Sequence, residues 1–206
     1  MNLKSLPYAI LKNPLVYWTY QRIVGGDSAR ADFIKDYVKP KPNMKILDIG
    51  CGPGNILDFL PEVNYYYGFD INKDYIDAAK KNYGNRGTFI CSTVKEFLGS
   101  EHKDFDIALS TGVIHHLDDN EAKQVFEIAK NALKSGGKLI TFDGCYRKGQ
   151  NKLARLFLKL DRGKFVRTQD LYLKLAQSHF KTVKASIDED SFNIPYTSLI
   201  MECIKD

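Results

Sequence analysis

The sequence predicts one α/β domain built on a mostly parallel sheet. Predicted strands and helices alternate at short spacing from residue 45 to residue 143, which indicates parallel strands with helices on both faces. A glycine-rich turn follows the first of these strands. The chain then closes with two successive strands that have no helix between them, and such neighbours pair antiparallel. We therefore expect a seven-stranded sheet with an antiparallel C-terminal strand pair.

Composition sets the broad class of protein. Hydrophobic residues make up 44% and charged residues 27% of the 206 residues, as in water-soluble globular domains. No apolar run approaches the ~18 residues that span a bilayer. Lys12 and Pro14 interrupt the apolar N-terminus, which also lacks a small-residue cleavage site, so no signal peptide is predicted. The four cysteines form no CxxC pair, which argues against a zinc site or a disulfide framework and suits the cytoplasm.

Residues 1–44 are expected to form a helical lid in front of the sheet. Tyr17, Trp18 and Tyr20 supply an aromatic stretch, and Tyr20 is a candidate acceptor-binding residue. Lids of this kind close before the chemical step. The alternative is an aromatic helix that packs on the core. A further helix follows, capped by Asp27 or Ser28, with an apolar stripe at residues 31–38; Pro40 and Pro42 end it.

The remaining elements follow in order. Predicted strands cover residues 45–49, 65–70, 88–91, 105–110 and 138–143. Helices between them cover residues 55–60, 72–84, 94–98 and a longer stretch that begins at Asp118 or Asp119 and ends at Gly136-Gly137. A helix capped by Thr168 then precedes strands at 180–187 and 197–204. All 206 residues are thus expected in one domain.

The strongest local signal is the run ILDIGCGPG at residues 46–54. Its glycines permit positive φ and let a ligand lie against the backbone, and ligands bind at the carboxyl ends of strands in such sheets. A dinucleotide fingerprint reads GxGxxG, whereas this turn reads GxGxG with Asp48 just before it. A carboxylate there suits an ammonium and a sulfonium better than a pyrophosphate. Asp70, after the second strand, stands where either cofactor would place a ribose diol. A dinucleotide site and a purely structural turn are the alternatives.

With LDIGCGPG in place, the sequence resembles the class I S-adenosylmethionine-dependent methyltransferases of the small-molecule type. The resemblance covers roughly residues 45–143 by motif, and the terminal strand pair is also shared. It implies a Rossmann-like three-layer sandwich, S-adenosylmethionine as cofactor, and methyl transfer. It places the glycine loop at the methionine part and Asp70 on the ribose, with Ile71 against the adenine. The cofactor-binding residues that it implies are Asp48, Gly50, Cys51, Gly52, Asp70, Ile71, Thr93, Val94, Ser110 and Thr111.

The sequence departs from the family pattern after the third strand. Members often have an acid there that reaches the adenine amino group, and this chain has Ser92-Thr93-Val94. Thr93 can still form a hydrogen bond to the adenine. Ser110-Thr111 ends the fourth strand, where members hold the methionine ammonium.

Two histidines follow the fourth strand and are the candidate catalytic residues. Methyl transfer needs an aligned nucleophile and, for a hydroxyl, a base that removes its proton. We expect His116, and after it His115, to be that base. The alternative is that both only shape the loop. The branches that methylate amino groups of RNA and DNA carry an Asn/Asp-Pro-Pro-Tyr/Phe motif here, which residues 110–113 do not match.

A basic segment is the most distinctive part of the chain. Residues 147–167 hold eight basic side chains and one acid, so they carry a net charge of +7 and the rest of the chain carries −2. Leu153, Leu156, Phe157 and Leu160 recur at helical spacing, which predicts a basic amphipathic helix. Such a helix binds an anionic ligand or lies on a membrane surface. We expect residues 144–167 to be a substrate-binding insertion, with Arg162 and Arg167 as candidates. A lid with a solvated charged face is the alternative.

The sequence as a whole predicts methyl transfer from S-adenosylmethionine to a small-molecule or lipid- or sugar-linked acceptor, at a hydroxyl group. An anionic or lipid-linked acceptor and a peripheral membrane contact fit the basic segment, and no DNA partner or metal is expected. A basic isoelectric point supports the alternative of an RNA methyltransferase, although no separate nucleic-acid module is present. A non-catalytic protein that binds the cofactor is the third alternative.

Overall fold

The computed structural model describes residues 26–61, 65–97, 102–160 and 163–206. The aromatic stretch with Tyr17, Trp18 and Tyr20 lies outside the described residues, as does Arg162. Of residues 1–44, where the lid is expected, the structure describes 26–44, which form α3 (Gly26–Phe33) and a π-helical turn, η1 (Ile34–Val38).

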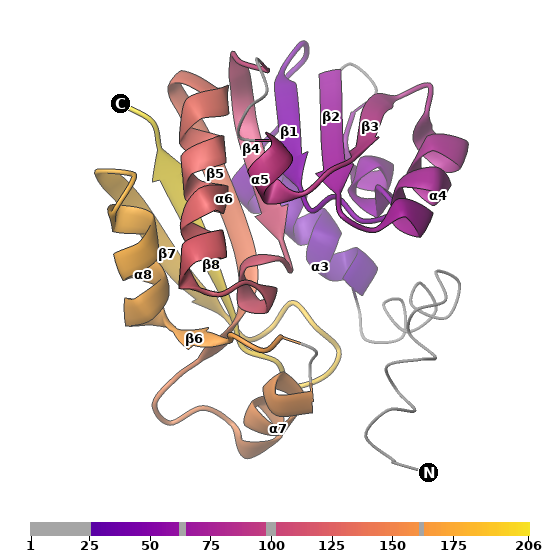
Figure 1. The fold of residues 1–206 in the computed structure, drawn as a ribbon. Coiled ribbons are helices and arrows are strands. Elements are labelled where there is room, and N and C mark those ends of the chain that lie inside the picture. The colour runs from indigo at the N-terminus through magenta and orange to yellow at the C-terminus, as the bar shows by residue number, and fades with distance from the viewer. Residues whose placement is uncertain (1–25, 62–64, 98–101, 161–162) are drawn as a thin grey trace.

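Seven strands form one continuous sheet in the order β3-β2-β1-β4-β5-β8-β7 (Figure 1). The strands β1 to β5 pair in parallel, whereas β8 lies antiparallel between β5 and β7. The expected fold class is thus confirmed, with a two-residue strand, β6 (Arg167–Thr168), added beside β5. The main strands are β1 (Lys45–Ile49), β2 (Tyr65–Asp70), β3 (Gly87–Cys91), β4 (Phe105–Thr111), β5 (Leu133–Tyr146), β7 (Thr182–Asp188) and β8 (Ser198–Ile204).

Helices cover both faces of the sheet and give three layers. One core cluster joins the sheet to α5 (Val94–Phe97), α6 (Asp119–Ala132) and α8 (Gln169–Gln177). The other joins it to α3, η1, η2 (Asn55–Phe59) and α4 (Lys73–Tyr83). Neighbouring positions of β1 serve opposite faces, because Ile46 belongs to the second cluster and Leu47 to the first. Both faces are therefore apolar, as the near-continuous hydrophobic strands predict.

Two helix starts follow from their caps. The Asn72 side chain accepts from the backbone N–H of Asp74 and Tyr75 at the start of α4. Asp118, the first of the two expected candidates, caps α6 and forms a capping box with Glu121. The end of α6 differs from expectation: the helix ends at Ala132, because the next residues already extend into β5, and Gly136 with its φ of 75° lies within that strand.

The end of β5 and the segment after it stand at the carboxyl edge of the sheet. β5 continues to Tyr146, beyond the expected residue 143, and α7 (Lys152–Leu160) follows beneath it in Figure 1. Leu158 packs against Gly144, where a Cβ would lie 2.6 Å from its Cδ2 atom. Among the helices of the described ranges, none has both the length and the apolar character to cross a bilayer.

Candidate active site

The glycine turn after β1 is held to β2 and open on its outer side. The backbone N–H groups of Gly50 and Cys51 both donate to the carbonyl of Phe69, at 2.8 and 3.0 Å. Gly50 and Gly52 have φ of 74° and 54°, which glycine adopts without strain. A Cβ on Gly50 would collide with Val113, whereas a Cβ on Gly52 would meet no described atom within 4 Å. The turn is thus packed at Gly50 and leaves room for a ligand at Gly52.

Asp70 stands at the end of β2 with its carboxylate turned to this loop. Its two oxygens accept from the backbone N–H of Gly52 at 3.0 Å and of Asn72 at 2.8 Å. Burial raises the pKa of Asp70, and these backbone donors act against the rise. The next side chain, Ile71, is 73% exposed. A carboxylate and an exposed apolar surface therefore lie next to each other at the edge of the sheet.

Asp48 lies buried beneath the turn. Its Oδ2 atom accepts from the Tyr66 hydroxyl at 2.5 Å, while Oδ1 is buried and has no hydrogen-bond partner among the described residues. Burial raises the pKa of this carboxyl to about 7, against the opposing hydrogen bond from Tyr66. The hydroxyl of Ser110, at the end of the adjacent strand β4, is also buried without a described partner. Two polar groups thus remain unsatisfied where β1 and β4 end.

The other expected cofactor-binding residues differ in their burial and in their hydrogen bonds. Cys51 is buried, so only its backbone faces the loop, and burial raises the pKa of its thiol strongly. The Thr93 hydroxyl donates to the Glu96 carboxylate at 3.0 Å, and the Glu96 backbone N–H donates back to that hydroxyl. Its proton is therefore committed to the first turn of α5. Val94 and Thr111 are half-buried.

The two histidines occupy a short 3-10 turn, η3 (Ile114–His116), directly after β4. His115 is buried, and its Nδ1 atom lies 2.8 Å from a carboxylate oxygen of Asp143, which also accepts from the His115 backbone N–H. His116 is exposed, with its ring centroid 4.2 Å from that of His115. The sequence analysis did not select Asp143, although an acid inside an apolar strand was a usable signal.

Arg167 has partners different from those expected of a substrate-binding residue. Its guanidinium donates to the Asp119 carboxylate and to the carbonyls of Ile114, Leu117 and Phe165, at 2.7–3.1 Å. These bonds use the five N–H donors of an arginine side chain. The buried Arg167 therefore ties η3 to the start of α6 and leaves no donor for an acceptor.

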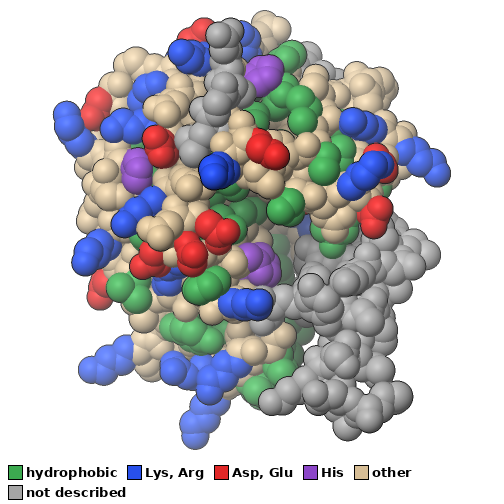
Figure 2. Space-filling model, viewed as in Figure 1, with side chains coloured by type: hydrophobic (Ala, Val, Ile, Leu, Met, Phe, Trp, Pro, Cys, Tyr) green, Lys and Arg blue, Asp and Glu red, His purple; other side chains and the backbone are tan. Residues whose placement is uncertain are grey.

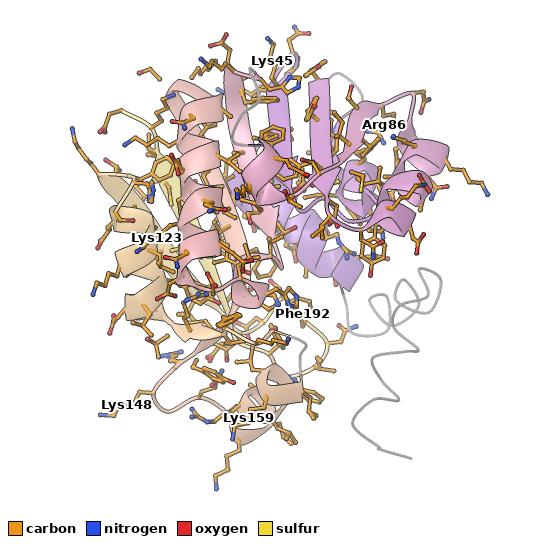
Figure 3. All side chains as sticks on the ribbon, in the orientation of Figure 1. Lys45, Arg86, Lys123, Lys148, Lys159 and Phe192 are labelled. Atoms are coloured by element: carbon orange, nitrogen blue, oxygen red, sulfur yellow. The ribbon has the colours of Figure 1, made fainter. Side chains whose placement is uncertain are left out.

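An aromatic pocket that the sequence analysis did not identify lies beside the end of β5. The ring of Phe142 stacks on Phe33 at 5.4 Å and lies 6.0 Å from Phe192, which is labelled near the carboxyl edge in Figure 3. The cavity beside it has a volume of about 250 Å³. It is lined by Ala29, Asp32, Phe33, Asp36, Tyr37, Phe142, Ile187, Asp188, Asp190, Ser191 and Ile200. Four of these lining residues are acids: Asp32, Asp36, Asp188 and Asp190. Their carboxylates do not complement the anionic acceptor that the basic segment suggests.

Comparison with known proteins shows which proteins the sequence resembles. A family model described as a methyltransferase domain matches residues 46–137, from β1 into β5. Wheat phosphoethanolamine N-methyltransferase is 30% identical over 131 residues, which are 61% of this chain and 25% of that protein. A tRNA (carboxymethyluridine(34)-5-O)-methyltransferase of Saccharomyces cerevisiae is 24% identical over 121 residues, 58% of this chain and 42% of that protein. The chain thus spans a quarter to two fifths of the length of these curated relatives.

Solved structures share the fold over the whole chain. Phosphoethanolamine N-methyltransferase 2 of Haemonchus contortus, in complex with phosphomonomethylethanolamine and S-adenosylhomocysteine, has a TM-score of 0.73 at 14% identity. The match covers 100% of this chain and 60% of that one. The family model covers the segment that carries LDIGCGPG. Residues 46–137 therefore match a methyltransferase domain, and the chain shares its fold with solved structures of S-adenosylmethionine-dependent methyltransferases.

Proposed function

We propose that the protein transfers the methyl group of S-adenosylmethionine to a hydroxyl group of a small-molecule acceptor. The observation that carries the proposal is the edge where β1, β2 and β4 end. An open glycine turn, a carboxylate beside an exposed isoleucine, and two buried polar atoms without described partners meet there. These features fit a ligand that has a ribose, a flat apolar base and a charged amino-acid part.

The residues that would hold the cofactor are arranged along this edge. Asp70 would accept from the ribose hydroxyls, because each carboxylate oxygen has a lone pair beyond the backbone bond that it already receives. Ile71 would pack on the adenine, with Thr93 and Val94 on the other side. Ser110 and Thr111 would meet the ammonium, while the Asp48 carboxyl lies buried beneath the turn. When bound, the cofactor supplies a methyl carbon activated by a sulfonium.

His116 is the residue that we place at the acceptor. It is exposed just beyond the carboxyl end of β4, where its imidazole can take the proton of the acceptor hydroxyl. With the cofactor bound, the acceptor oxygen would receive the methyl group while His116 holds the proton that the hydroxyl loses. His115 is buried and paired with Asp143, so we assign this pair the positioning of η3 rather than contact with the acceptor.

Replacement of the base tests its role. We expect His116→Gln to lower kcat by about 10²-fold or more while the affinity for S-adenosylhomocysteine stays unchanged, since loss of a general base affects the proton transfer alone. Turnover is measured with a labelled methyl donor and affinity by calorimetry. The matched control is His102→Gln, an exposed histidine before the amino end of β4. Equal losses of turnover and cofactor affinity would show that His116 only shapes the loop.

The acceptor class is tested with the same labelled donor. The protein is incubated with a cell extract separated into small-molecule, lipid and RNA fractions, and the Gly52→Val variant, whose side chain would fill the open turn, is the blank. We expect label in the small-molecule or lipid fraction. The yeast relative and the basic segment favour RNA as the second candidate. Label that stays with RNA and is released by ribonuclease would replace the present proposal.

A further inference from the structure

Helix α7 is apolar on two opposite sides, although only one of them meets the protein. Ala154 and Leu158 are 2% and 1% exposed and form its inward side. Three other leucines, which we call the outer leucines, are exposed to 54%, 48% and 69%: Leu153, Leu156 and Leu160. Asn151 starts the helix by accepting from the Leu153 backbone N–H at 2.8 Å. A helix with exposed leucines beside basic side chains has the character of one that lies on a membrane surface.

Helix geometry shows that the outer leucines point away from the domain. At about 100° per residue they lie within about 60° of one another, and their centre is about 150° from that of the inward pair. Phe165 adds a ring that is 40% exposed in the segment that follows. The three leucines thus form a continuous apolar stripe, about half or more of which is exposed.

The cations of the segment stand beside this stripe. Lys152 and Lys159 occupy the helix positions next to the outer leucines, and Lys148 and Lys164 are exposed at either side of α7. None of these four lysines forms an ion pair with a described residue, whereas Arg147 pairs with Glu189. Figure 3 shows Lys148 and Lys159 extending from the lower end of the molecule, where Figure 2 shows basic and apolar surface together.

We propose that α7 is a docking helix for an anionic lipid surface. Charge complementarity selects this occupant, because helix α7 contains no acid and the segment carries a net charge of +7 on an otherwise slightly acidic chain. The outer leucines would enter the boundary between headgroups and acyl chains, and the lysines would remain at the phosphates. A nine-residue helix is too short to span a bilayer, so it would lie in the interface.

Docking through α7 would orient the protein on the bilayer. The helix lies at the carboxyl edge of the sheet, on the same side as the glycine turn and η3 (Figure 1). Binding through α7 would turn that edge towards the bilayer. The inference does not depend on the proposed function, because vesicle binding is measured without a methyl donor or an acceptor.

The test is co-sedimentation of the full chain with vesicles of phosphatidylcholine alone or mixed with phosphatidylglycerol. We expect binding to the mixed vesicles only, and weaker binding as salt rises from about 0.1 M to about 1 M. Lys152→Gln with Lys159→Gln should lower the partition coefficient about 25-fold, at about fivefold for each lysine near the surface. Leu153→Ser with Leu156→Ser and Leu160→Ser should abolish binding.

Matched controls separate docking through α7 from a general effect of surface charge or of exposed leucines. Lys80→Gln with Lys81→Gln removes the same charge from exposed positions of α4, and Leu171→Ser removes a leucine that is 52% exposed on α8. Both controls should bind as the wild type does. Absence of wild-type binding, or unchanged binding of the leucine variant, would overturn the proposal. Binding to an RNA oligonucleotide that needs the lysines but not the leucines would also overturn it. A leucine variant that changes oligomeric state or loses thermal stability would overturn it as well.

Discussion

At the scale of single residues, two carboxylates near the same turn occupy different environments. Asp70 is half-buried and accepts two backbone N–H groups, whereas Asp48 is 1% exposed and accepts one tyrosine hydroxyl. The first can therefore stay charged and accessible to a ligand. The second favours its neutral form more strongly, because burial outweighs its single hydrogen bond.

The accessible carboxylate leads to a binding prediction. Asp70→Ala should weaken the binding of S-adenosylhomocysteine by about 1–3 kcal/mol, the usual cost of leaving buried polar groups without a partner. Calorimetry measures the affinity, and thermal unfolding verifies that the variant is folded. Asp74→Ala, an exposed acid in the first turn of α4, is the control and should bind normally. Unchanged affinity of a folded Asp70→Ala protein would assign the ribose contact to another residue.

The buried carboxylate leads to a pH prediction. Because the folded-state pKa of Asp48 is about 7 against an ordinary value of 3.8, the unfolded chain releases this proton first as pH rises. Stability should therefore fall between about pH 4 and pH 7. Asp48→Asn keeps an acceptor for Tyr66 but has no charge, so it should gain about 2–4 kcal/mol over wild type at about pH 8 relative to about pH 5. Urea unfolding at both pH values measures this difference, and parallel pH profiles would contradict it.

At the scale of elements, Arg167 connects η3, β6 and the start of α6. Arg167→Lys should lower the free energy of unfolding by about 1–3 kcal/mol, because the carbonyls of Ile114 and Leu117 would lose donors that a lysine cannot replace together. Urea denaturation measures the effect, with Lys164→Gln as an exposed control. A variant of normal stability with a raised KM for the acceptor would return Arg167 to the substrate site.

The basic segment shows what periodicity can determine at this scale. The spacing of Leu153, Leu156 and Leu160 correctly predicted a helix, and it left open which side of that helix meets the domain. In the structure Ala154 and Leu158 face inward, because Gly144 of β5 gives the Leu158 side chain room to approach the sheet. The alternation of apolar and basic residues cannot reveal this choice, since both sides of the helix are apolar.

At the scale of the whole molecule, ligand binding should raise the stability of the folded protein. A saturating cofactor product raises the free energy of unfolding by RT ln(1 + [L]/Kd), or about 2.7 kcal/mol at a hundred times Kd. We expect S-adenosylhomocysteine to raise Tm by several degrees and NAD to leave it unchanged. Differential scanning fluorimetry measures both, with Gly52→Val as the variant that should not respond. A shift with NAD alone would contradict the assignment of the turn to S-adenosylmethionine.

By itself, the sequence determined the class of fold and the position of the glycine turn. Strand and helix periods, glycines and caps are local properties, so the order of elements, the start of α4 at Asn72 and the ILDIGCGPG turn were predictable from neighbouring residues. The tertiary structure decided what depends on distant partners. It placed β8 between β5 and β7, joined His115 to Asp143 across 28 residues, and committed Arg167 to the protein. These contacts are set by how helices and strands pack, and packing brings together residues whose spacing along the chain has no fixed period.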